Sequence, residues 1–98
     1  MPANNDNKAD ALFDLGMCLF YQDRVAEAVP QLRQSIELTR SVGTQEDRQL
    51  RLAEALRKSG DRAGAIDLYN KLKASDRPNV RESANYGLAG IEHGQAHP

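Results

Sequence analysis

Cys18 carries the most nucleophilic side chain in the 98-residue sequence, and it is the only cysteine. A thiolate can attack a substrate or ligate a metal, but one cysteine excludes an intrachain disulfide. Cys18 aligns with Ala55 and Ala89 in an internal repeat of the chain. Because small residues at these positions are expected to point inward, we expect Cys18 to be a buried small residue and not a catalytic nucleophile.

The other groups with possible chemistry are two histidines and adjacent acidic residues. His93 and His97 are four residues apart, as metal ligands can be, but Gly94 interrupts the helix between them and no third ligand is apparent. The pair Glu46 and Asp47 begins a predicted helix, where negative charge favours the helix dipole. Catalysis needs a nucleophile, base or metal grouped in a pocket. We therefore predict no catalytic residues, no metal, no cofactor and no enzymatic activity.

The balance of charge excludes further classes of function. Thirteen basic and fourteen acidic residues give a net charge of −1, which lacks the positive field that nucleic-acid binding requires. No apolar run approaches the roughly 20 residues that span a bilayer. The N-terminal stretch is polar and has no apolar signal core. These features predict a cytoplasmic protein that binds neither nucleic acid nor membrane.

Apolar residues recur with helical spacing along most of the chain, and no stretch shows the alternation of a strand. We predict five helices, at about residues 9–21, 25–40, 45–59, 62–74 and 80–93. The predicted ends rest on residues that favour caps and turns, namely Asp23, Gly43 with Thr44, Gly60 with Asp61, and Asn79 with Glu82. Residues 1–8 are expected to form a disordered leader, and residues 95–98 a frayed tail.

The helices fall into a repeat. A shift of 37 residues places Leu15 on Leu52, Gly16 on Ala53 and Leu32 on Tyr69; a further shift of 34 places Leu52 on Tyr86, Ala53 on Gly87 and Gly60 on Gly94. A period in the thirties with two helices in each unit is typical of helical solenoids.

The residues of the repeat resemble those of the tetratricopeptide repeat (TPR) family. They are Leu12, Leu15, Gly16, Leu19, Ala28, Leu32 and Ser35 in the first copy, Leu52, Ala53, Leu56, Gly60, Asp61, Ala65, Tyr69 and Leu72 in the second, and Tyr86, Gly87, Gly90 and Gly94 in the third. The resemblance implies an all-α fold, a short right-handed superhelical array of antiparallel helix pairs. It divides a single domain at 9–94 into repeats at about 9–42 and 46–79 and a terminal helix at about 80–93.

Small residues at Gly16, Ala53 and Gly87 would allow helices to cross closely, with Leu32 and Tyr69 filling the space beside the crossings. In the first helix, we expect one face to hold the fold; it comprises Leu12, Leu15, Gly16, Cys18 and Leu19. The first helices of successive repeats line the inner face of such an array, so residues outside the packing stripe should face a groove. The predicted groove residues are Phe13, Met17, Phe20, Tyr21, Leu50, Glu54, Arg57, Lys58, Arg81, Leu88 and Ile91.

The apolar members of this set have two interpretations. Burial of each such side chain is worth roughly 1.5–3 kcal/mol, so either a partner covers Phe13, Met17 and Phe20, or these residues thicken the small core. The first hypothesis for function is a scaffold that binds a partner peptide or helix in the groove. The alternatives are a self-associating assembly module, which would form a homo-oligomer, and an accessory or regulatory subunit of an enzyme or secretion system.

Overall fold

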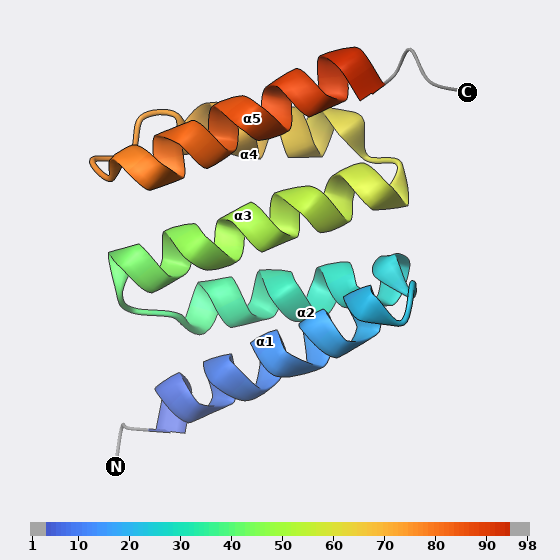
Figure 1. Cartoon of the computed structure of the whole chain (residues 1–98). Helices are drawn as coiled ribbons and strands as arrows, with labels where there is room; N and C mark the ends of the chain where they lie inside the picture. Colours follow the sequence, from blue (N-terminus) through green and yellow to red (C-terminus); the bar gives the residue numbers. More distant parts are fainter. Residues whose placement is uncertain (1–3, 95–98) are drawn as a thin grey trace.

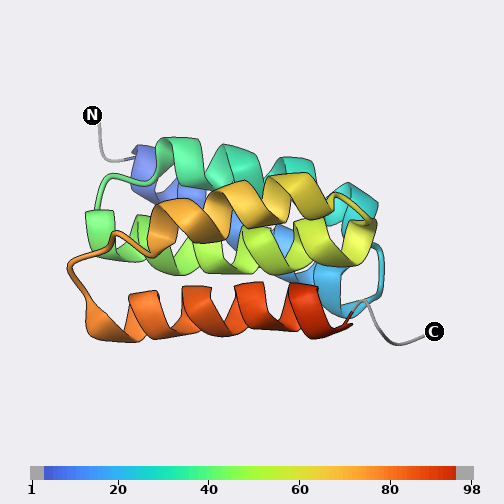
Figure 2. The ribbon, with the colours of Figure 1, turned by 90° about the horizontal axis from the view of Figure 1, so that it is seen from above.

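The computed structural model describes residues 4–94, which form five helices and no strand, so the all-α prediction is confirmed (Figure 1). The helices are α1 (Asn4–Tyr21), α2 (Val25–Leu38), α3 (Val42–Ser59), α4 (Arg62–Leu72) and α5 (Pro78–Gly94). Each helix packs against the next along the chain, and α5 also packs against α3. Seen from above, α2 and α5 lie on opposite sides of α3 (Figure 2). No helix within residues 4–94 is both long enough and apolar enough to cross a membrane.

Gly16 marks the place where α1 and α2 cross most closely. A Cβ atom at Gly16 would lie 2.8 Å from Leu32 Cδ2 and 2.9 Å from Leu32 Cγ, both of which are far too close for unbonded carbons. Leu32 is fully buried at this crossing. The prediction that a glycine here permits close approach is therefore confirmed.

Gly87 has the same role between α4 and α5. A Cβ atom at Gly87 would overlap the ring of Tyr69, lying 2.6 and 2.7 Å from its two Cε atoms. Tyr69 is the second repeat's counterpart of Leu32 and belongs to the same buried cluster. A large residue on the second helix of each repeat thus fills the space beside a glycine on a first helix.

Helix α5 differs from the expected orientation. The third copy of the motif predicts that Tyr86 and Gly90 belong to the packing stripe, yet Tyr86 is 84 % exposed. The residues that α5 packs inward are Val80, Ala84 and Ile91, which are buried, and Leu88, which is partly buried. These four form the broadest apolar stripe of the helix, and a terminal helix with neighbours on one side places that stripe against them.

The packing face of α1 also differs from the predicted one. Leu15 is 47 % exposed and Cys18 is exposed, although both were expected to be buried. Their counterparts on α3, Leu52 and Ala55, are buried because α2 and α4 both pack against α3. Among the described residues, α1 packs mainly against α2, so this face of α1 is open.

Several helix ends lie elsewhere than predicted. Helix α1 begins at Asn4, so residues 4–8 of the expected leader are helical; residues 1–3 and the expected tail at 95–98 lie outside the described part. Asp23 does not cap α2; it adopts a positive φ of 65°, as its counterpart Gly60 does with 99°. The N-cap of α3 is Ser41, not Thr44, because the Ser41 side chain accepts a hydrogen bond from the backbone N–H of Thr44.

The remaining residues predicted at helix ends are Asp61, Gly43 and Asn79, and only Asp61 has the predicted role. Asp61 caps α4 as expected, accepting a hydrogen bond of 2.9 Å from the backbone N–H of Gly64. Gly43 lies within α3, and Asn79 lies within α5, which begins at Pro78. Proline suits the first position of a helix because it has no N–H to leave unpaired there.

Two arginines connect helices that are distant in the sequence. Arg48 on α3 donates hydrogen bonds to Thr39 Oγ1 at 2.8 Å and to Asp10 Oδ1 at 2.5 Å, and its guanidinium lies 4.8 Å from the centre of the Phe13 ring. These contacts tie α1 to α3. Buried charged side chains are stable only when such partners are present.

Arg77, in the connection before α5, holds that connection to the beginning of α3. Its guanidinium donates to the carbonyl oxygen of Gly43 at 2.8 Å and to Asp47 Oδ1 at 3.3 Å. The nearby Ser75 hydroxyl donates to Glu46 Oε1 at 2.9 Å. The start of α5 is therefore fixed against the N-terminal turns of α3.

Candidate functional site

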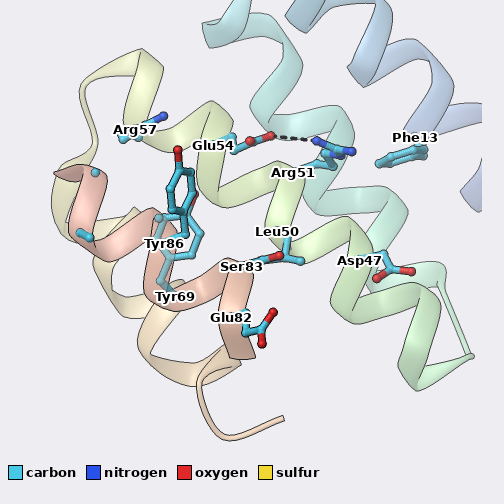
Figure 3. Close-up of a pocket in the computed structure, with 13 residues that line it drawn as sticks. Phe13, Asp47, Leu50, Arg51, Glu54, Arg57, Tyr69, Glu82, Ser83 and Tyr86 are labelled. Atoms are coloured by element: carbon cyan, nitrogen blue, oxygen red, sulfur yellow. Dashed lines mark hydrogen bonds and ion pairs between the residues drawn. The ribbon is translucent and has the colours of Figure 1, made fainter. Parts of the chain in front are cut away.

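A groove of about 1150 Å³ lies between α1, α3 and α5 (Figure 3). We call it the inner groove. Its lining residues are Phe13, Asp47, Leu50, Arg51, Glu54, Arg57, Tyr69, Glu82, Ser83, Tyr86, Gly87, Ala89 and Gly90. Tyr69 is the one member from α4, and its ring reaches the groove beside Gly87 of α5.

Four of the predicted groove residues lie in this lining: Phe13, Leu50, Glu54 and Arg57. Phe13 is partly covered by Arg48, and Leu50 packs partly against the core. Glu54 accepts an ion-pair contact of 3.2 Å from Arg51. The side of the groove formed by α3 therefore matches the position that the repeat predicts.

The other apolar candidates belong to the core. Met17, Phe20 and Leu88 are partly buried and pack against the central cluster, and Ile91 is a buried member of it. The placement of Ile91 contradicts its prediction as a groove residue and follows from the rotation of α5. Of the two interpretations of Met17 and Phe20, the structure favours thickening of the core.

The remaining three candidates lie outside the groove lining. Tyr21 is exposed and packs edge to face on Phe20, with 5.4 Å between ring centres. Lys58 lies with its ammonium 5.0 Å from the centre of the Phe20 ring. Arg81 donates a hydrogen bond of 2.8 Å to the carbonyl oxygen of Ser75 and thus supports the turn before α5.

Sequence reasoning missed the side of the groove formed by α5. Glu82, Ser83, Tyr86 and Ala89 line it because α5 turns a different face inward from the one its motif predicts. The apolar spacing of Val80, Ala84, Leu88 and Ile91 carried the needed signal, since hydrophobic periodicity identifies the buried face directly.

The charges of the inner groove differ between its two ends. Asp47 and Glu82 lie on the turns near the beginnings of α3 and α5, whereas Arg57 lies near the end of α3. Asp47 pairs with Arg77, and Arg51 pairs with Glu54. Within the described part of the chain, Arg57 has no ion-pair partner. Among the described residues, the groove therefore has an unpaired acidic side chain, Glu82, near the beginning of α5 and an unpaired basic side chain, Arg57, near the end of α3.

Tyr69 forms part of the groove floor at the basic end. Its side chain is only 3 % exposed, and burial raises the pKa of its phenol; Glu54 adds to the rise and Arg57 opposes it. The described residues give its hydroxyl no hydrogen-bond partner, and this oxygen is not shut off from solvent. The hydroxyl is thus a free donor that opens into the groove.

The side chains that line the inner groove offer groups suited to binding. Among the residues that the structure describes, no group of three or more histidine, cysteine or acidic side chains could hold a metal ion. The side chains of His93 and His97 lie outside that part. The groove combines aromatic, aliphatic and charged side chains, as protein interfaces do.

The comparison with protein families matches the tetratricopeptide repeat to residues 10–38 and again to residues 49–77. These two matches cover more than half of the chain, which belongs to the tetratricopeptide repeat family. Repeats of this family generally mediate interactions between proteins and typically form non-enzymatic scaffolds. Searches of curated proteins and of solved structures returned no match.

Proposed function

We propose that the inner groove binds a peptide or short helix of a partner protein. The observation that carries this proposal is the exposure of Tyr86, which is 84 % exposed on a wall of the groove. Tyr86 shares the groove lining with other apolar side chains such as Phe13 and Leu50, and tyrosine is enriched among the residues that dominate binding energy.

The lining of the groove supports a protein ligand. Its volume of about 1150 Å³ exceeds the roughly 300–1000 Å³ of typical small-molecule pockets. Charged side chains such as Asp47, Arg51 and Glu82 surround its apolar surfaces, which is the pattern of an apolar centre with a polar rim. A peptide segment lying along α3 would contact both the apolar surfaces and the charged rim.

The replacement Tyr86→Ala is expected to weaken partner binding about tenfold or more, because it removes the largest exposed ring of the groove. Partners captured from native lysate with the wild-type chain would be identified and purified, and their affinity for each variant measured by calorimetry. The free energy of unfolding should hardly change, because an exposed ring contributes little to folding.

The matched control is Tyr21→Ala, which removes a tyrosine that is 74 % exposed and lies outside the groove. This control should bind the partner as the wild type does. If Tyr21→Ala weakens binding and Tyr86→Ala does not, the inner groove is not the binding site.

Self-association is a second candidate function, supported by the open face of α1. Leu15 is 47 % exposed, whereas its counterpart Leu52, covered by neighbouring helices, is 5 % exposed. A second copy of the chain that covers Leu15 and Cys18 would remove this difference.

The test of self-association is the mass in solution across a concentration series. If a second copy covers the open face of α1, the mass should rise toward that of a dimer, and Leu15→Glu should restore the monomer mass because it places a charge in the interface. A mass that stays at the monomer value up to high concentration would exclude this candidate.

A further inference from the structure

The basic end of the inner groove contains two polar groups without partners from the described chain. Arg57 provides a guanidinium, and Tyr69 provides a hydroxyl on a side chain that is 97 % shielded from solvent, since only 3 % is exposed. Figure 3 shows Arg57, Tyr69 and Tyr86 gathered at one end of the groove, with Asp47 far from them. An unpaired guanidinium and a free hydroxyl are both hydrogen-bond donors.

The glycines of α5 make room for these two groups. A Cβ atom at Gly87 would overlap the Tyr69 ring, and a Cβ atom at Gly90 would lie 3.1 Å from Arg57 Nη1. Gly87 and Gly90 are one helical turn apart, so the ring and the guanidinium lie beside successive turns of α5. The Tyr69 ring from α4 and the Arg57 guanidinium from α3 thus both lie against the same stretch of α5.

We propose that the Arg57 end of the inner groove is a carboxylate subsite, which takes an aspartate or glutamate side chain of the bound partner segment. Arg57 forms the ion pair, and the Tyr69 hydroxyl donates a second hydrogen bond to the same carboxylate. This proposal rests on the proposed function of the groove.

Charge complementarity selects an acidic residue over other partners for these groups. Glu54 is the opposing charge near Tyr69, but it is already paired with Arg51 at 3.2 Å. A carboxylate accepts hydrogen bonds from a guanidinium in a planar, two-pronged geometry, which a neutral or basic residue cannot reproduce.

The opposite end of the groove sets the direction of the bound segment. Asp47 is paired with Arg77 at 3.3 Å, which leaves Glu82 as the acidic residue of the groove lining without an ion-pair partner from the described chain. A segment with its acidic residue at Arg57 and a basic residue at Glu82 therefore matches the charges of the groove, and the reversed segment opposes them.

The test uses a library of random 12-residue peptides displayed on phage and selected on the full 98-residue chain. Selected sequences should carry aspartate or glutamate at one position. The best peptide would be synthesised together with an analogue in which that residue is changed to asparagine or glutamine. The analogue should bind the wild type about tenfold more weakly, because it lacks the charge that pairs with Arg57.

The variants Arg57→Gln and Tyr69→Phe assign the loss to the subsite. Arg57→Gln should weaken binding of the acidic peptide about tenfold and should bind the analogue as well as the wild type does, which is the signature of a direct pair in a double-mutant cycle. Tyr69→Phe should weaken the acidic peptide a few-fold while its thermal unfolding stays close to that of the wild type. Arg62→Gln, which alters an exposed arginine of α4 outside the groove, is the control and should change nothing.

The outcomes separate the subsite from the groove. If selected peptides lack an acidic position, or if the analogue loses equal affinity on wild type and Arg57→Gln, the subsite is overturned while the groove still binds peptides. If no peptide is selected, or if Tyr86→Ala leaves binding of the selected peptides unchanged, the groove proposal fails and the subsite fails with it.

Discussion

Replacement of Leu32 by alanine is expected to lower the free energy of unfolding by about 2–5 kcal/mol. Leu32 is fully buried where α1 crosses α2, and its Cγ and Cδ2 atoms occupy the space beside Gly16. The substitution removes buried methyl groups and leaves a cavity between two helices. Because a domain of this size is stable by only about 5–15 kcal/mol, the loss should be evident in urea unfolding monitored by circular dichroism.

The matched control for this prediction is Leu15→Ala. Leu15 is 47 % exposed, so the same chemical change should cost less than about 1 kcal/mol. Equal losses at Leu15 and Leu32 would contradict the burial of Leu32 at the crossing of α1 and α2.

A second substitution tests whether Leu32 and Gly16 share one space. A Cβ atom at Gly16 would lie 2.9 Å from Leu32 Cγ, so Gly16→Ala alone should destabilise the chain. In the Leu32→Ala background that carbon is absent, and Gly16→Ala should cost less than it does in the wild type. A difference of about 0.5–3 kcal/mol is expected for two residues in direct contact.

Replacement of Gly87 by alanine is expected to destabilise the packing of α5 by about 1–3 kcal/mol, the usual cost of overpacking a filled site. The new methyl group would overlap the ring of Tyr69, which is buried and cannot move aside freely. The gain of about 1 kcal/mol that alanine has over glycine in a helix offsets part of this cost, so the net loss is up to about 2 kcal/mol. Hydrogen exchange should therefore quicken in α5 before it changes in α1 and α2.

Gly90→Ala is the control within the same helix. Its Cβ atom would meet only the Nη1 atom of Arg57, at 3.1 Å, and Arg57 is exposed and flexible enough to shift. The helix propensity of alanine should then leave Gly90→Ala as stable as the wild type, or slightly more stable. Equal destabilisation by both substitutions would mean that glycine matters for the backbone of α5 and not for the Tyr69 contact.

The repeat in the sequence predicted the helices and their closest crossing because both depend on local spacing. Gly16 and Leu32 occupy equivalent positions to Ala53 and Tyr69, and each of these four residues is buried. Leu32 faces Gly16 of its own repeat and Tyr69 faces Gly87 of the next helix, so each contact joins two helices that are adjacent in the sequence. The fold class therefore follows from the residues alone.

The exposure of the outer faces did not follow from the repeat, because alignment assumes that every copy has the same neighbours. Leu15 and Leu52 align, yet only Leu52 lies between two other helices. For α5, the motif residue Tyr86 predicts one inward face and the apolar stripe with Ile91 selects another. Where the two signals differ, burial of apolar area determined the orientation.

The candidate site was predicted on the side formed by α3, where the repeat motif and the apolar stripe indicate the same buried face. Leu50, Glu54 and Arg57 of α3 line the groove as the array geometry implies, because α3 has neighbours on both sides. Tyr86 and Tyr69 required knowledge of how α5 is rotated. The apolar stripe of α5 indicates that rotation, but alignment of the repeat placed Tyr86 on the inward face instead.

The attachment of Arg77 to the beginning of α3 fixes the end at which α5 begins. The guanidinium of Arg77 holds the connection to the Gly43 carbonyl at 2.8 Å, whereas the far end of α5 rests on side-chain packing. A helix of 17 residues is about 25 Å long, so a pivot of about 10° at its start displaces its far end by about 4 Å. Such a pivot changes the width of the groove beside Arg57 and leaves its width beside Asp47 almost constant. If the groove binds partner segments as proposed, segments of different thickness should contact the same fixed end near Asp47 and differ in how far they open the end near Arg57.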